Sequence, residues 1–135
     1  MRHAIAIAIA IAIPLAALLC GVSLSASAQT PINYSQAKAL ADRDEASLPA
    51  DVAEAMRSTQ ADTLKAGVEA CATPQPDTSP FVVVAQLDAQ GRIEHTWRQG
   101  TTPLSICMEK FLRGRILLVP ARSPFYVSYE LSFTP

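Results

Sequence analysis

The amino-terminal segment most constrains this chain, because it decides which residues belong to the fold. After a short basic start, an almost unbroken apolar run extends from Ala4 to Leu19. Ala26-Ser27-Ala28 then places small residues at the −3 and −1 positions of a cleavage site. This order is typical of a secretory signal peptide. We therefore expect residues 1–28 to be removed between Ala28 and Gln29, and the rest to fold in the periplasm or outside the cell.

A retained membrane anchor is the alternative to cleavage, because residues 4–22 are long enough to span a bilayer. Pro14 and the Ala-Ser-Ala site favour cleavage, after which we expect no stable membrane insertion. A lipid anchor on Cys20 is not expected, because Leu19 precedes it where a lipoprotein signal has a small residue.

The charge of the chain is modest and excludes one class of partner. The formal net charge is −1 at pH 7, and residues 29–78 are acidic whereas residues 79–135 are mildly basic. Neither half has the strong basic excess that marks a nucleic-acid-binding domain. We expect no nucleic-acid partner, and one compact domain that is large enough to bury a core.

Two cysteines, Cys71 and Cys107, remain after the expected cleavage. An even count in an exported chain indicates a disulfide bond. The alternative is a reactive Cys107 assisted by His95, since a catalytic thiol needs a base beside it. The oxidising compartment favours the structural bridge.

Residues 29–78 predict a helical region that ends in a proline-rich linker. Residues 34–48 have helical composition, although their apolar stripe is thin. Pro49 suits a first helical turn, and apolar residues then recur near every fourth position as far as Cys71. We expect a long amphipathic helix over 49–71 that covers one face of a sheet, followed by a linker over 73–80.

Residues 79–135 predict a hairpin, a helix and a final strand. The run 81–87 is rich in β-branched residues, a turn follows at 88–91, and residues 92–98 alternate with Ile93, His95 and Trp97 on one face. Thr102-Pro103 is a typical helix start, with an apolar stripe over 104–111. An extended apolar run over 115–119 leads to a strand over 125–133. The odd-numbered residues of that strand form a packed face and the even-numbered residues a wetter one.

These elements predict an α+β fold. Amino-terminal helices precede a small, mainly antiparallel sheet built from a β-hairpin, a helix and a strand, with one helix across a face. Whether the sheet edge is open or covered by the helix over 34–48 is left undecided by the pattern.

The chain lacks the residue patterns of common active sites. It has no glycine-rich phosphate loop, no serine-hydrolase elbow, and one histidine after cleavage, so we expect no enzymatic activity, no cofactor and no metal. His95 is interpreted as a partly buried histidine. A group of carboxylates is interpreted as a solvated helix face: Asp42, Asp44, Glu45, Asp51 and Glu54.

The order of elements after residue 80 resembles the carboxy-terminal domain of TonB and its periplasmic relatives. Residues 81–93 (FVVVAQLDAQGRI) resemble the strand, Asp-x-x-Gly-Arg-Val turn and second strand that open that domain. Residues 104–112 are similar to the family helix, Val119-Pro120 to its Phe-x-Pro stretch, and 127–133 to its closing strand. The resemblance implies a sheet that binds protein partners in the cell envelope. The chain differs from TonB in its cleavable signal and short proline cluster, so we do not expect energy transduction.

The leading hypothesis is therefore an exported, non-enzymatic protein-interaction module with an envelope protein as its partner. The alternative is a periplasmic inhibitor or immunity-type protein that binds an enzyme or effector. Four residues are candidates for partner binding, and their side chains are aromatic or carry a guanidinium group: Trp97, Arg98, Tyr126 and Tyr129.

Overall fold

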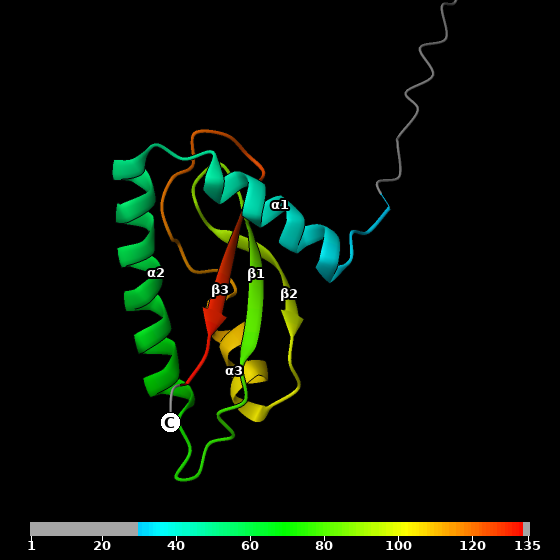
Figure 1. The fold of residues 1–135 in the computed structure, drawn as a ribbon, viewed down its shortest axis with the longest axis vertical. Helices are drawn as coiled ribbons and strands as arrows, with labels where there is room; N and C mark the ends of the chain where they lie inside the picture. Colours follow the sequence, from blue (N-terminus) through cyan, green and yellow to red (C-terminus); the bar gives the residue numbers. More distant parts are fainter. Residues whose placement is uncertain (1–29, 134–135) are drawn as a thin grey trace, which may run out of the picture. The chain divides into compact units, whose positions relative to one another are not determined.

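A computed structural model of the protein describes residues 30–133, and the predicted cleavage site at Ala28 and Gln29 lies outside them. The described chain combines helices with a three-stranded antiparallel sheet (Figure 1). In chain order, its elements are α1 (Tyr34–Ala46), α2 (Ala50–Cys71), β1 (Phe81–Leu87), β2 (Ile93–Gln99), α3 (Pro103–Leu112) and β3 (Phe125–Leu131). The predicted α+β fold class is confirmed.

The sheet has the strand order β2-β1-β3, with β1 in the centre and antiparallel to both neighbours. A tight turn joins β1 to β2. The Asp88 carboxylate accepts hydrogen bonds from the backbone N–H groups of Gln90 and Arg92, each 2.8 Å long. Gly91 has a φ of 78°, and a Cβ there would lie 2.2 Å from the carbonyl oxygen of Leu118. The turn therefore requires glycine, both for its conformation and for the close approach of the chain.

Helices cover both faces of the sheet. Residues of β1 and β3 such as Val83, Leu87 and Val127 pack with α2 and α3 in the main core. On the opposite face, Val84 and Tyr126 pack against Ala37 and Ala41 of α1. Figure 1 shows α1 crossing one face of the sheet and α3 lying behind the other. The small alanine side chains let α1 lie close to the strands, although its apolar stripe is thin.

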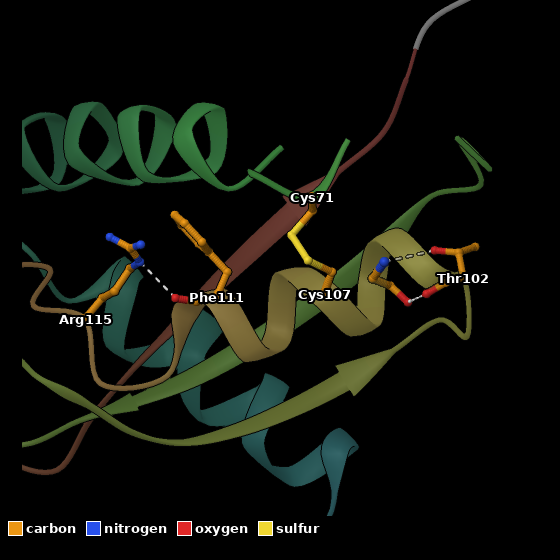
Figure 2. The surroundings of a disulfide bond; sticks show 6 residues. Cys71, Thr102, Cys107, Phe111 and Arg115 are labelled. Atoms are coloured by element: carbon orange, nitrogen blue, oxygen red, sulfur yellow. Dashed lines mark hydrogen bonds between the residues drawn. A yellow bond between two sulfur atoms is a disulfide. The ribbon is translucent and has the colours of Figure 1, made fainter. Parts of the chain in front are cut away.

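The starts of α1 and α3 carry recognisable caps. Asn33 and Gln36 form a reciprocal capping box, in which each side chain accepts a hydrogen bond from the other residue's backbone N–H. Thr102 accepts a hydrogen bond at 3.0 Å from the Ser105 N–H, and Pro103 occupies the first turn of α3 (Figure 2). The helix start predicted from Thr102-Pro103 is thus confirmed.

A disulfide bond joins the end of α2 to the middle of α3. Cys71 and Cys107 are bonded with their Cα atoms 5.8 Å apart (Figure 2), as the even cysteine count predicted. Close to this bond, a Cβ on Gly67 would lie 2.6 Å from the Met108 methyl carbon. The absence of a side chain at Gly67 therefore lets the two helices approach where the bond holds them.

The predicted orientation of side chains along β2 is wrong, because a β-bulge interrupts the alternation. Ile93 pairs with Leu87 and His95 pairs with Gln86, so Glu94 has no partner of its own on β1. Ile93 consequently turns into the main core, while Trp97 packs on the α1 side. His95 is exposed rather than partly buried. The extra residue of a bulge shifts every later side chain to the opposite face.

The alternation of β3 is confirmed on one face and corrected on the other. Phe125, Val127 and Tyr129 are buried in the main core, as predicted. The even-numbered face is not wet, because α1 lies over it and leaves Tyr126 only 9% exposed. The strand ends at Leu131, two residues earlier than expected.

The predicted extended run over 115–119 forms only a short pairing with the start of β2. Ile116 bridges Arg92, and the Ile93 N–H donates to the Arg115 carbonyl oxygen at 2.8 Å. The Gly114 N–H donates in turn to the Ile93 carbonyl oxygen at 2.9 Å. The segment 114–117 therefore covers the first part of the outer edge of β2.

Reducing the disulfide should lower the free energy of unfolding by roughly 2–4 kcal/mol, because the bond restricts the unfolded chain. Urea unfolding with and without reductant measures the change. A protein with Cys71→Ser and Cys107→Ser is the control, since reductant should not alter it. Equal midpoints for the oxidised and reduced wild-type protein would contradict the stabilising role of the bond.

Candidate functional site

The outer edge of β3 is closed by side chains from α1 and α2. The Tyr126 N–H donates to Asp44 Oδ2 at 3.0 Å, and the Ser128 N–H donates to Glu45 Oε1 at 2.9 Å. Gln60 Nε2 donates to the Ser128 carbonyl oxygen at 3.1 Å. These side chains occupy backbone groups that a neighbouring strand would otherwise use. A partner strand cannot pair with Tyr126 and Ser128 while α1 and α2 stay in place.

Asp44 is the central member of this closure. It follows Ala37 and Ala41 on the inner stripe of α1, and its side chain is only 1% exposed. Arg122 Nη2 donates to Asp44 Oδ1 at 2.6 Å, which gives the buried carboxylate an opposite charge. A buried charge that is both paired and hydrogen-bonded can be retained in the fold.

The interpretation of the acidic group as a solvated face is wrong for Asp44 and Glu45, although Asp42, Asp51 and Glu54 are exposed. The spacing of Ala37, Ala41 and Asp44, at i, i+4 and i+7, could have revealed the buried position of Asp44. Gln60 likewise follows Met56 by four residues on α2 and is buried.

Glu45 remains partly shielded from solvent. Burial raises the pKa of its carboxyl group, and the hydrogen bonds from the Ser128 N–H and Gln60 oppose that rise. The two donors therefore offset part of the cost of desolvating the carboxylate. Lys38 adds an ion pair from α1 to Glu130 of β3, with an N–O distance of 3.0 Å.

The outer edge of β2 is open beyond the short pairing with 114–117. The Tyr126 and Ser128 N–H groups point away from β1. The β3 residues that alternate with them therefore form the backbone hydrogen bonds to β1, where their partners are Val83, Ala85 and Leu87. The β1 residues between these point their backbone groups to the other side, where they bond to His95, Trp97 and Gln99 of β2.

Alternation therefore turns the backbone groups of Thr96 and Arg98 away from the sheet. Among residues 30–133, no backbone or side-chain group forms a hydrogen bond with these outward groups. This stretch is the open edge, defined here as residues 94–99, and it lies along the right side of the sheet in Figure 1.

On the α3 side of the open edge, a hydrogen-bonded network fixes the side chains. Glu109 of α3 accepts from Thr96 Oγ1 at 3.0 Å and from Arg98 Nε at 3.0 Å. Arg113 donates to Thr96 Oγ1 at 3.0 Å and to Glu109 Oε1 at 3.1 Å. A single carboxylate thus organises two guanidinium groups beside the edge.

The pKa of Glu109 reflects two opposed effects. Burial alone would raise it, but hydrogen bonds from Arg98, Thr96 and Arg113, together with the positive charge of Arg113, leave the pKa below its ordinary value. The carboxylate therefore stays ionised and keeps both arginines in place at neutral pH.

On the α1 side of the open edge, Trp97 provides an aromatic surface. Its indole N–H donates to the Ile32 carbonyl oxygen at 2.9 Å, and its ring lies 5.9 Å from the Tyr126 ring. The His95 ring is 6.3 Å from the Trp97 ring and is exposed. Trp97 is partly buried, so its orientation is fixed while part of its surface remains accessible.

The four predicted partner-binding residues divide into two pairs. Trp97 and Arg98 are consecutive residues of the open edge, and their side chains lie on the α1 side and the α3 side of the sheet, respectively. Tyr126 and Tyr129 are buried, at 9% and 1% exposure, so the structure places them in the interior and not on a contact surface. Tyr129 belongs to the main core, where burial raises the pKa of its hydroxyl group.

Cys71 and Cys107 are bonded to each other, which contradicts the alternative of a reactive Cys107 assisted by His95. Residues 30–133 contain no group of three His, Cys, Asp or Glu side chains arranged to hold a metal ion.

None of the helices within that range is both long and apolar enough to cross a membrane.

A small apolar recess lies at the end of α2 that is remote from the disulfide bond. It has a volume of about 130 Å³ and lies between the start of α2 and the segment 118–121. Its lining comes from residues such as Leu48, Val52 and Phe125, and contains no charged side chain. The recess can accept apolar atoms, but it offers no polar side chain to orient a ligand.

Comparison of the chain with protein-family models, curated proteins and solved structures found no match. The interpretation of the open edge therefore depends on the geometry and charges described above.

Replacing Asp44 with Ala should lower the free energy of unfolding by about 2–4 kcal/mol, because the Tyr126 N–H loses its acceptor and Arg122 loses its buried partner. Asp42→Ala on the exposed side of α1 is the matched control and should cost less than about 1 kcal/mol. Chemical unfolding measures both values. Equal losses in the two variants would show that Asp44 does not hold the edge closed.

The network around Glu109 should make part of the stability acid-sensitive. A carboxyl group whose folded pKa is lowered stabilises the fold above its unfolded pKa of about 4.3, and this contribution is lost as the pH falls below that value. Unfolding midpoints measured from neutral pH to about pH 2 should fall less steeply in Glu109→Gln than in the wild-type protein. Parallel curves would contradict this assignment.

Proposed function

We propose that this protein is an exported, non-enzymatic interaction module that binds an extended segment of an envelope protein along the open edge of β2. The observation that carries the proposal is the difference between the two edges of the sheet. Side chains of α1 and α2 occupy the β3 edge at Tyr126 and Ser128, whereas the backbone groups of Thr96 and Arg98 face outward without partners among residues 30–133. Strand addition at an open edge is a common mode of peptide recognition.

The surroundings of the open edge support selective pairing. A segment paired with β2 would place alternate side chains on its two faces. Those on the α3 side would meet Arg98 and Arg113, and those on the α1 side would meet Trp97 and His95. Main-chain hydrogen bonds would supply affinity, while these four side chains would supply selectivity.

Sequence features support the location and the class of protein. The pattern of residues 1–28 is that of an export signal, and a disulfide bond suits an oxidising compartment. The hairpin, helix and final strand follow the order on which the resemblance to the TonB carboxy-terminal domain is based. We therefore place the partner in the cell envelope.

Proline at position 96 provides a direct test, because it removes the outward N–H without removing a bond to β1. Thr96→Val is the matched control, since it removes the same hydroxyl group but keeps the N–H. A partner from envelope extracts should be retained by the wild-type protein and by Thr96→Val, and lost with Thr96→Pro.

Amide hydrogen exchange gives a second measurement that does not depend on a variant. In the recovered complex, exchange at Thr96 and Arg98 should slow relative to the free protein. Unchanged exchange at both amides, or equal retention by Thr96→Pro, would contradict binding along this edge. A recovered enzyme whose activity falls in the complex would favour the inhibitor or immunity-type alternative.

A further inference from the structure

We propose that the open edge of β2 selects an extended segment bearing a carboxylate near its carboxy-terminal end. This inference depends on the proposed function, because it specifies the partner of the same edge. The carboxylate belongs either to an acidic side chain or to the end of the partner chain. Both sources present the same chemistry to the arginine side chains described below.

The position of the segment 114–117 defines where a partner strand would end. This segment pairs with the start of β2, and Gly114 is its last residue before the open edge begins. A partner strand would occupy the same line, next to Gly114. Antiparallel pairing, the arrangement of every strand pair in this sheet, would direct the carboxy-terminal end of the partner toward Gly114.

Arginine side chains lie along the open edge, and two of them lie near that end. Arg92 Nη1 donates to the Gly114 carbonyl oxygen at 2.7 Å and has no ion pair within residues 30–133. Arg113 reaches Thr96 and its side chain is 58% exposed. Arg98 lies two residues beyond Thr96, farther from Gly114, and shares the Glu109 carboxylate with Arg113. The Arg92 and Arg113 guanidinium groups thus lie near the place where the partner would end, and Arg98 is joined to Arg113 through Glu109.

The local charge is positive and is only partly neutralised by neighbouring acids. Residues 92–115 contain five basic residues against two acidic ones, Glu94 and Glu109. Glu109 is already engaged by two arginines, and Glu94 lies exposed in the bulge. A guanidinium group binds carboxylates through directed, charge-assisted hydrogen bonds. Charge complementarity therefore favours an anionic segment over a neutral or basic one.

A second copy of this chain is a competing occupant of the edge. Pairing two β2 strands would bring two arginine-rich edges together, and like charges across a strand pair oppose association. The charges therefore favour a different chain with a carboxylate in the corresponding place.

Four synthetic peptides of one extended sequence can test the proposal on the purified protein. One has an internal acidic residue near an amidated end, and one has a free terminal carboxylate without an internal acid. The third is neutral and amidated, and the fourth carries lysine in the acidic position. Either anionic peptide should bind more tightly than the neutral one, with the lysine peptide weakest, and added salt should reduce the difference.

Arg113→Gln should weaken binding of the anionic peptide roughly two- to fivefold, the range for an exposed ion pair, while leaving the neutral peptide unchanged. Arg57→Gln on α2 is the matched control, because Arg57 is exposed and lies away from β2. Equal affinities for the anionic and neutral peptides would overturn the proposed selectivity.

Amide hydrogen exchange at Thr96 and Arg98 distinguishes failure of this proposal from failure of the function on which it depends. Slowed exchange with all four peptides at equal affinity would preserve edge pairing and refute the carboxylate preference. Absence of slowed exchange with every peptide, and with the envelope partner, would refute both. Concentration-dependent slowing without any peptide would identify a second copy as the occupant and also overturn the proposal.

Discussion

The hydrogen bond from the Tyr126 N–H to the buried Asp44 carboxylate determines how this sheet meets its surroundings. A three-stranded sheet has two outer strands, and each exposes backbone groups that can pair with another chain. Asp44 and its neighbour Glu45 close one of these edges with side-chain oxygens in place of a fourth strand. They also fix α1 over the sheet, where its alanine stripe alone would hold it weakly. Because this edge is closed at Tyr126 and Ser128, β2 is the outer strand whose central backbone groups, at Thr96 and Arg98, face outward without partners among residues 30–133.

The side chains beside the two edges therefore differ in their chemical groups. Carboxylates accept hydrogen bonds and can satisfy outward N–H groups, so acidic residues suit the closed β3 edge. Guanidinium groups only donate, so Arg98 and Arg113 cannot satisfy an outward N–H, and their own donors bond to Glu109 and Thr96 Oγ1 instead of the β2 carbonyl groups. Their charge also discourages indiscriminate strand pairing, which is a hazard for any exposed edge. An edge of this kind remains available to a partner while resisting association with copies of itself.

Much of the fold followed from local patterns, because those patterns depend on neighbouring residues alone. The Thr102 cap, the β-branched run of β1 and the alternation of Phe125, Val127 and Tyr129 each indicated the element that is present. The features that define the site depend on contacts between distant residues. The bulge at Glu94 is set by how β2 pairs with β1, and it reversed the predicted face of Trp97. The choice of open edge depends on where α1 packs, and the sequence pattern left that undecided.

The disulfide bond between α2 and α3 also affects residues that it does not contact. Cys107 and Glu109 lie on the same short helix, and Glu109 is the group that orders Thr96, Arg98 and Arg113. Oxidation of the two thiols therefore clamps the scaffold that aligns the arginine side chains. A newly made chain whose thiols are still reduced would carry these side chains on an unclamped helix. Under the proposed function, completion of this surface is in this way coupled to oxidation of the two thiols.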